Sequence, residues 1–571
     1  MSDNVKVWVL LAIVASGVLV GASWSHLARA GAAAAAKRPT SEWIHRGLMA
    51  LCAGFGIWAF TLFGQMHDHG VNGHQDFHAH DCYHYYFGSK YLKEWGYDGM
   101  YFATVAALEE IGRDEPRKAI TFNRIRDLDG SARFLYRADF EPHLAEAKAR
   151  FTPARWTLFK SELSFLRDLT MSTDWWHGVM LDNGFNPPPS YAAITGVFAN
   201  HIPFNAGTWK WLGTFDLVLM AAGVAAVGWA FGVVPALFAM VVTGNAPLTT
   251  FNWTGGSFFR QLWLFLLMIG VSFLARRKWT AAGAALGACA AAVFFPVFFL
   301  VGALVPLAYR VRHPGGREPL IRAASAAAVA VTLLVGVSVL VYGVEPWSQW
   351  WHRIVAHDLT FFDNHIGLKK ITTFAPEVGR QSFGASDSVY PDWNRALVLR
   401  AHRGAIIEIL LSLFLSGWLV VGGLRARPAE ACLVVGSGLL VIWTMPAGYY
   451  TIYAGTFAAV ILANRSTWGE RRFSLVAVAL VAALAMRRFE RDLITQSFLI
   501  SSGWVFCIFA LSAMTWLERS AIRLTRAQKQ RFATGALAVA GALLLTLVGI
   551  RNWGRTAEFL PPEIARGATV A

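Results

Sequence analysis

The chain is poor in charge and in cysteine, and both shortages exclude whole classes of protein. Only 15% of its 571 residues are charged, whereas a soluble protein normally carries about a quarter. The five cysteines are scattered, and all but Cys82 fall within apolar segments. The sequence therefore predicts neither a disulfide framework nor a Cys-x-x-Cys site. No tandem repeat of about 20–50 residues is visible either.

Apolar residues take the place of the missing charge. They make up 55% of the chain, and the mean hydropathy is +0.42. Several stretches of roughly 20 apolar residues are long enough to cross about 30 Å of hydrocarbon. The net charge of +15 does not indicate nucleic-acid binding, because the basic residues lie in short loops where they act as topology signals. The sequence predicts an all-α polytopic membrane protein.

The positions of Lys and Arg orient the apolar segments. If the first basic loop, which ends at Arg46, is cytoplasmic, the chain makes about 12–14 transmembrane passes. Two long loops, 67–205 and 344–403, then lie on the outer face with their amphipathic helices. The uncharged stretch 279–309 has positive charge at both ends, so it crosses an even number of times. Two short passes broken near Pro296, or a re-entrant hairpin, satisfy that requirement.

This map divides the chain into four parts. The first apolar segment, 7–24, has its positive charge mainly after it, which favours a retained anchor over a cleaved signal peptide. One charged loop, 487–492, falls on the outer face against the general rule. The parts are 1–46, an N-terminal anchor helix and cytoplasmic loop; 47–210, the first core helix and a large outer loop; 211–465, the membrane core with the second outer loop; and 466–571, the C-terminal transmembrane helices.

A histidine-rich stretch begins the first outer loop. Six of the 16 histidines lie between His67 and His84, interleaved with aspartates. Asp81 precedes an amphipathic segment, 82–95, that is typical of a helix lying along a membrane surface. A carboxylate at the start of such a helix is favoured by the exposed N–H groups, and it could act as a general base toward a substrate hydroxyl. A simple helix cap is the alternative.

The same stretch offers ligands for a transition metal. Two His-x-His pairs, with Asp76 and Asp81 nearby, provide nitrogen and oxygen donors for zinc or a similar ion: His67, His69, His78 and His80. His80 and His84 also have the i,i+4 spacing of metal-binding pairs on helices. A loop whose histidines only bind water and polar groups is the competing hypothesis.

Basic residues mark two further clusters on the outer face. Arg260 stands at the mouth of an apolar helix with no acidic partner near it in sequence. Its guanidinium suits bidentate contact with phosphate oxygens, although a snorkelling arginine is the alternative. His365, Lys369 and Lys370 lie in the stretch 355–371 of the second outer loop. Because outer loops tend to be poor in lysine, this cluster predicts a phosphate site, against the alternative of a solvated loop.

These clusters, in this order, resemble the GT-C superfamily of membrane glycosyltransferases, and more closely the bacterial polyprenyl-phosphate-mannose-dependent mannosyltransferases. The resemblance is spread over roughly 47–465 and lies in four stretches: DCYHYYFGSKYL (81–92), NPPPSYAAITGVF (186–198), NWTGGSFFRQLW (252–263) and TMPAGYYTIYAGTF (444–457). The chain departs from the family in two places. Cys82 replaces the aromatic residue after the motif aspartate, and Phe294 and Phe295 stand where a lysine usually precedes the proline.

The resemblance implies a GT-C-like fold in the bacterial cytoplasmic membrane, with the active site facing outwards. It implies inverting transfer of mannose or another hexose from a polyprenyl-phosphate donor to a hydroxyl of a lipid or glycan acceptor. Asp81 would be the general base, with Asp76 as second choice. The donor phosphate would bind a cluster of basic side chains: Arg260, His365, Lys369 and Lys370. Six residues would line the substrates: His80, His84, Tyr85, Tyr86, Lys90 and Asn252.

Cofactor, partners and alternatives complete the expectation. No cofactor is required, although a divalent metal is compatible with the family. The implied partners are the donor, the acceptor and membrane lipids; nucleic acid is not expected, and any partner in a membrane complex is unidentified. A metal-dependent membrane enzyme and a non-catalytic GT-C-like scaffold subunit stay open, because a fold does not imply an activity. A transporter is disfavoured, since few ionisable residues lie at mid-membrane depth.

Overall fold

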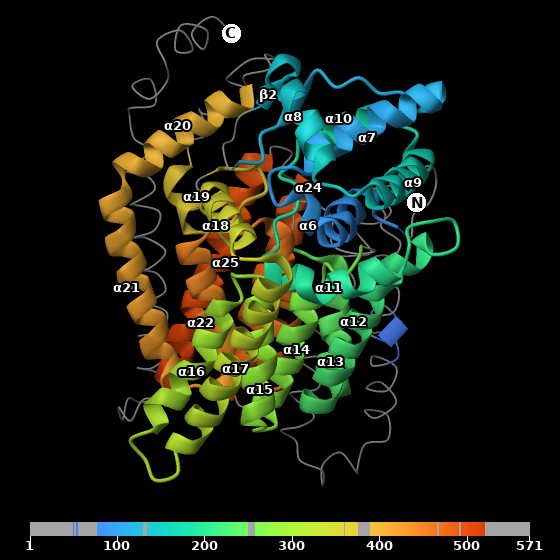
Figure 1. Ribbon diagram of the computed structural model, residues 1–571. Coiled ribbons are helices and arrows are strands. Elements are labelled where there is room, and N and C mark those ends of the chain that lie inside the picture. Colours follow the sequence, from blue (N-terminus) through green and yellow to red (C-terminus); the bar gives the residue numbers. More distant parts are fainter. Residues whose placement is uncertain are drawn as a thin grey trace, which may run out of the picture.

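Long helices and a cap of shorter ones at one end make up the molecule (Figure 1). The computed structural model describes residues 77–129, 134–248, 257–358, 360–374, 389–464, 467–489 and 493–519, and also residues 50, 53 and 54. It is 79% helix and 2% strand, which confirms the mostly helical class. The predicted passes 7–24 and 532–551, and nearly all of 47–66, lie outside the described residues.

The bundle is built from apolar helices, because a helix satisfies its own backbone polar groups in an environment without water. Among the described residues, four helices are long and apolar enough to cross a membrane: α12 (Trp209–Phe231), α17 (Arg317–Tyr342), α21 (Ala405–Gly423) and α25 (Leu493–Arg519). They support a membrane-embedded protein.

Shorter apolar helices fill the rest of the bundle. They are α13 (Val233–Asn245), α14 (Leu262–Ala275), α15 (Trp279–Ala292), α16 (Val297–Arg310), α22 (Pro428–Trp443) and the pair η4 (Gly448–Tyr453) and α23 (Ala454–Leu462), accompanied by α24 (Thr467–Phe489). At 1.5 Å per residue, a helix of 14 residues such as α15 is about 21 Å long, less than the ~30 Å of a hydrocarbon core. The number of passes therefore stays a prediction.

The break inside the uncharged stretch 279–309 occurs where the sequence placed it. Helix α15 ends at Ala292, and Pro296 is the N-cap of α16. Small residues let the neighbouring helices approach closely. A Cβ atom at Gly283 would collide with the carbonyl oxygen of Ala323 in α17, so α15 and α17 pack backbone to backbone.

The cap consists of two segments that leave the bundle. The first contains α4 (Ala79–Cys82), the π-helix η1 (Tyr83–Phe87), α5 (Gly88–Lys90), α6 (Leu92–Trp95), α7 (Met100–Asp114), η2 (Pro116–Lys118), α8 (Arg137–Ala149), α9 (Pro153–Thr170), α10 (Thr173–Met180) and α11 (Pro189–His201). Strands β1 (Arg124–Arg126) and β2 (Phe134–Tyr136) pair antiparallel within it. The second contains α18 (Glu345–Asp358), α19 (Leu368–Thr373) and α20 (Val389–Arg403).

The expectation of a surface helix over 82–95 is wrong. Helical turns do run through this segment, but Tyr91 interrupts them and most of the side chains are buried in an aromatic core. On such a surface helix Lys90 would face water, but it is buried because its ammonium pairs with Glu162 of α9. The charge of Lys90 is therefore balanced by Glu162 inside the cap and not solvated by water.

Candidate functional site

Asp81 is held in the first turn of α4 and is 5% exposed. The Asp81 N–H donates to Nδ1 of His78, the N-cap residue, at 3.1 Å. The same ring nitrogen lies 3.2 Å from the Asp81 carboxylate. Helix α4 therefore fixes the backbone of Asp81, and the carboxylate of Asp81 points to the loop before α14.

Arg260 reaches that carboxylate from the loop before α14. Its guanidinium contacts Asp81 Oδ2, and both side chains are almost fully buried. The rings of Tyr85 and Tyr449 flank the guanidinium, with centroids 5.6 and 4.6 Å from its carbon, a distance at which an aromatic face attracts a cation. Arg260 has no acidic partner nearby in the sequence, and the fold supplies Asp81 of α4 as that partner.

A buried carboxylate in α12 anchors the loop that carries Arg260. Asp216 is fully enclosed. One of its oxygens accepts a hydrogen bond from the Gln261 N–H at 2.8 Å, and the other accepts one from the Ser257 N–H at 3.1 Å. These two hydrogen bonds, made by residues on either side of Arg260, define the path of the loop.

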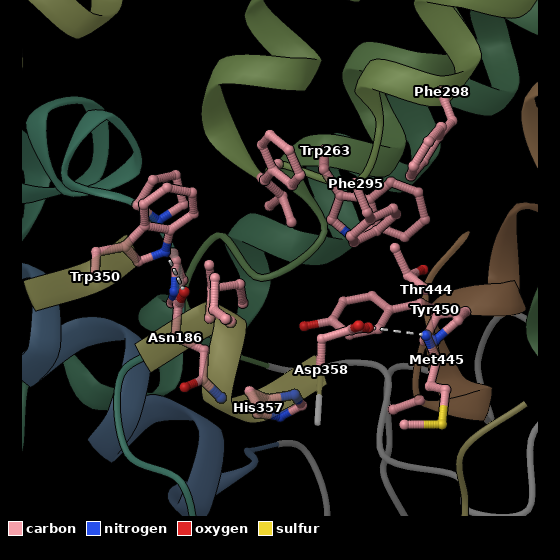
Figure 2. Close-up of a pocket in the computed structure, with 18 of the residues that line it drawn as sticks. Asn186, Trp263, Phe295, Phe298, Trp350, His357, Asp358, Thr444, Met445 and Tyr450 are labelled. Atoms are coloured by element: carbon pink, nitrogen blue, oxygen red, sulfur yellow. Dashed lines mark hydrogen bonds between the residues drawn. The ribbon is translucent and has the colours of Figure 1, made fainter. Parts of the chain in front are cut away.

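A cavity of about 380 Å³ opens on the bundle side of Arg260. Trp263 of α14, Phe295 and Phe298 at the α15–α16 break, and Tyr450 form part of its aromatic wall. Figure 2 shows Trp263, Phe295 and Phe298 on one side of the space and the polar side chains Asn186, His357 and Asp358 on the other.

Two hydrogen bonds in Figure 2 fix the polar side of the cavity. Trp350 Nε1 donates to the Asn186 carbonyl at 3.0 Å, and the Met445 N–H donates to Asp358 Oδ1 at 3.3 Å. Burial, reinforced by Arg353, lowers the pKa of His357 to about 4, so His357 is neutral at pH 7. The cavity therefore has an aromatic wall on one side and a polar side that includes the Asp358 carboxylate, and Arg260 is part of its lining.

Three side chains converge on the opposite side of Asp81. His80 Nε2 and His84 Nδ1 lie 3.6 and 3.9 Å from Asp182 Oδ2. Asp182 follows α10, so the triad joins the start of the cap's first segment to a later part of the same segment. Burial lowers the pKa of both histidines, that of His84 to about 3. Neutral imidazoles and a carboxylate are a ligand set that could hold a transition metal.

The predicted phosphate-binding residues are only partly brought together. Lys369 Nζ lies 3.4 Å from Oδ2 of Asp358, a cavity-lining carboxylate. His365 is buried in a bridge to Ala447, and burial lowers its pKa well below the usual value, so it adds no positive charge at pH 7. Lys370 does not line the cavity: its ammonium donates to a loop carbonyl at 3.1 Å and lies over a tryptophan ring. Its role in phosphate binding stays a prediction.

The substrate-lining residues also divide. Tyr85 lines the cavity. Lys90 and Tyr86 do not line it, because both side chains bond to Glu162 inside the cap; their contact with substrates stays a prediction. His78 contacts Asp81 rather than joining His80 and His84 as a ligand. Four other predicted residues lie outside the described part: Asp76, Asn252, His67 and His69.

No family model, curated protein or solved structure matches this chain. The activity therefore has to be inferred from the site itself. Asp182, Asp216 and Asp358 escaped the sequence-based prediction, because each is a single acid without a motif and acquires its place only through the fold. Tyr449 and Tyr450 had a signal, since they lie in the TMPAGYY stretch that carried part of the family resemblance.

Proposed function

We propose that the chain transfers a hexose from a polyprenyl-phosphate donor to an acceptor hydroxyl, with Asp81 as the general base. One observation carries the proposal: a largely apolar cavity is lined by a buried arginine that contacts a buried aspartate. A polyprenyl-phosphate sugar has the same order of parts, with an apolar chain, an anionic phosphate and then the reacting carbon.

The cavity suits the donor in chemistry and in position. Aromatic and aliphatic side chains would cover the first part of the polyprenyl chain, which gains from leaving water. Arg260 is part of the lining of this cavity, where its planar fork of N–H donors can bind two phosphate oxygens. The neighbouring tyrosines would hold the guanidinium in place while it exchanges partners.

The reaction follows from this placement. Asp81 accepts the proton of the acceptor hydroxyl as its oxygen attacks the anomeric carbon. The bond from that carbon to the phosphate oxygen breaks, its electron pair leaves with the phosphate, and the carbon inverts. Arg260 stabilises the charge that develops on the leaving phosphate. In the free protein Arg260 contacts Asp81, so donor binding would draw the guanidinium toward phosphate and release the carboxylate for the incoming proton.

The test measures transfer from radiolabelled polyprenyl-phosphate mannose, and from other polyprenyl-phosphate hexoses, by the purified full chain. Asp81→Asn should lower kcat by about 10²–10⁴-fold, the usual contribution of a general base. Arg260→Lys keeps the charge but loses the bidentate fork, so it should raise the KM for the donor and also lower kcat. The controls are Asp174→Asn, on an exposed helix start, and Arg322→Lys, in a surface ion pair; both should behave like the wild type.

Folding has to be separated from chemistry, because removing one partner of a buried ion pair costs about 3–5 kcal/mol of stability. The double variant Asp81→Asn/Arg260→Gln restores a neutral pair and should recover stability without recovering transfer. Full transfer by Asp81→Asn would overturn the base assignment. If the wild type transfers none of the hexoses, the proposal fails and the non-catalytic scaffold is the hypothesis that survives.

A further inference from the structure

We propose that His80, His84 and Asp182 bind one divalent transition-metal ion, beside but separate from the proposed sugar-transfer chemistry. The inference goes beyond the proposed function and does not depend on it. It rests on the geometry of three side chains, on the hydrogen bonds that orient one of them, and on the exposure of the site on one side.

The ligand atoms already stand close to coordination distance from a common centre. Those of the three residues lie within 4.8 Å of one another, and two pairs, involving Asp182 Oδ2, are 3.6 and 3.9 Å apart. Donors on a tetrahedral zinc ion, with bonds of about 2.0–2.1 Å, are about 3.3–3.4 Å apart. These two separations need to shorten by roughly half an ångström or less. At their present length they are too long for direct hydrogen bonds.

Tyr101 selects the tautomer of His84 that a metal requires. The Tyr101 hydroxyl donates its one proton to the Asp182 carbonyl oxygen at 3.0 Å. Its oxygen also lies 3.1 Å from His84 Nε2, and with that proton committed the imidazole has to be the donor there. Nδ1 of a neutral His84 then carries a lone pair, and it is Nδ1 that faces Asp182. An outer hydrogen bond that fixes the tautomer is the usual support of a metal-binding histidine.

The composition of the triad selects the class of ion. Two imidazoles and one carboxylate suit zinc and neighbouring first-row metals, whereas magnesium and calcium prefer oxygen ligands. Three protein ligands leave a coordination position open. The Asp182 side chain is 39% exposed and His80 19% exposed, so that position is reachable from solvent for an oxygen ligand such as water or a hydroxyl.

The experiment measures metal binding directly. The full chain, purified with a tag that contains no histidine and stripped with EDTA, is reloaded with Zn²⁺ for elemental analysis and titrated with Co²⁺, whose visible absorption reports ligand type and geometry. We expect one ion per chain. Asp182→Asn and His80→Gln should weaken binding by at least about 100-fold, since a change in an outer hydrogen bond alone costs about 10–100-fold.

Tyr101→Phe provides a milder test, because it leaves all three ligands in place. It should weaken Co²⁺ binding by about 10–100-fold while intrinsic tryptophan fluorescence shows a folded protein. His143→Gln, an exposed histidine on α8, is the matched control and should bind like the wild type. A combined His67→Gln/His69→Gln/His74→Gln variant removes the three histidines that precede His78 in the stretch and should also retain the ion.

Two results would overturn the proposal. One is a wild-type chain that holds no stoichiometric zinc after reloading. The other is a Co²⁺ spectrum that survives in both Asp182→Asn and His80→Gln but disappears in the His67, His69 and His74 variant, which would assign the metal to those upstream histidines. Neither result depends on sugar transfer, so failure of the metal site and failure of the proposed function are distinguishable.

Discussion

Replacing Lys90 by methionine would leave a buried carboxylate in the cap without its cation. Lys90 Nζ lies 2.5 Å from Glu162 Oε1, and the two side chains are 1% and 3% exposed. Glu162 also accepts hydrogen bonds from the Tyr91 hydroxyl at 2.7 Å and the Phe204 N–H at 3.0 Å. These neighbours remain in Lys90→Met and stabilise part of the carboxylate charge.

The size of the effect follows from those contacts. Breaking a buried ion pair by removing one partner costs about 3–5 kcal/mol. Because Glu162 keeps the other hydrogen bonds, we expect a cost at the lower end of this range, about 3 kcal/mol. That cost corresponds to an equilibrium constant for local opening that is roughly 100–200-fold larger. The double variant Lys90→Met/Glu162→Gln removes both charges and should recover part of the loss, since glutamine can still accept from Tyr91.

Amide hydrogen exchange followed by mass spectrometry is the assay, read on peptides from 83–95 and from α9. Lys93→Met is the matched control, because Lys93 is an exposed lysine of the same segment. The family resemblance, in contrast, implies that Lys90 lines the substrates. If Lys90→Met leaves the exchange of both peptides unchanged and alters sugar transfer alone, the buried pair is not what Lys90 contributes, and the reasoning is refuted.

Three further changes test other parts of the site. The pKa of His357 is lowered to about 4, so as the pH falls the unfolded chain binds a proton at this residue before the folded protein does. The contribution of His357 to stability should therefore be constant above about pH 6.5 and should fall as the pH drops from there toward 4. In pH-dependent unfolding, His357→Gln should reduce that slope. Asp216→Asn replaces one hydrogen-bond acceptor by an N–H donor and leaves a buried backbone N–H without its acceptor. Steady-state kinetics should then show a KM for the sugar donor that is about 10–100-fold higher. Val355→Trp should fill part of the cavity and raise the KM for the sugar donor, whereas Val344→Trp, outside the lining, should not. If the two variants have the same KM for the donor, this cavity is not the donor site.

The membrane helices and their breaks were the most predictable features, because their causes are local. Apolar runs identify segments that bury their backbone polar groups. The break before Pro296 followed from charge on both sides of an uncharged stretch and from the missing N–H of proline. Both the break and the short α15 and α16 are in the structure. Local sequence does not determine whether so short a pair crosses the membrane or returns within it.

The partners of the site residues were least predictable, because they are far apart in the chain. Arg260 was assigned to a phosphate on the ground that no acid lies near it in sequence, yet it contacts Asp81. The i,i+4 spacing of His80 and His84 was visible, but Asp182 was not, since one aspartate after a helix has no periodicity or motif. Sequence patterns report what one element does; which elements meet is decided by tertiary packing.

Asp81 stands between two chemically different surroundings, one formed by histidines of its own segment and one by Arg260 from a distant loop. On one side His80 Nδ1 lies 3.9 Å from its Oδ1, and the other nitrogen of that ring faces the proposed metal. On the other side Arg260 contacts Oδ2 and lines the apolar cavity. An ion at the triad and a phosphate at Arg260 would therefore act on the same carboxylate from opposite sides. Any effect of metal on donor affinity has to equal the effect of donor on metal affinity, because a coupling free energy is reciprocal.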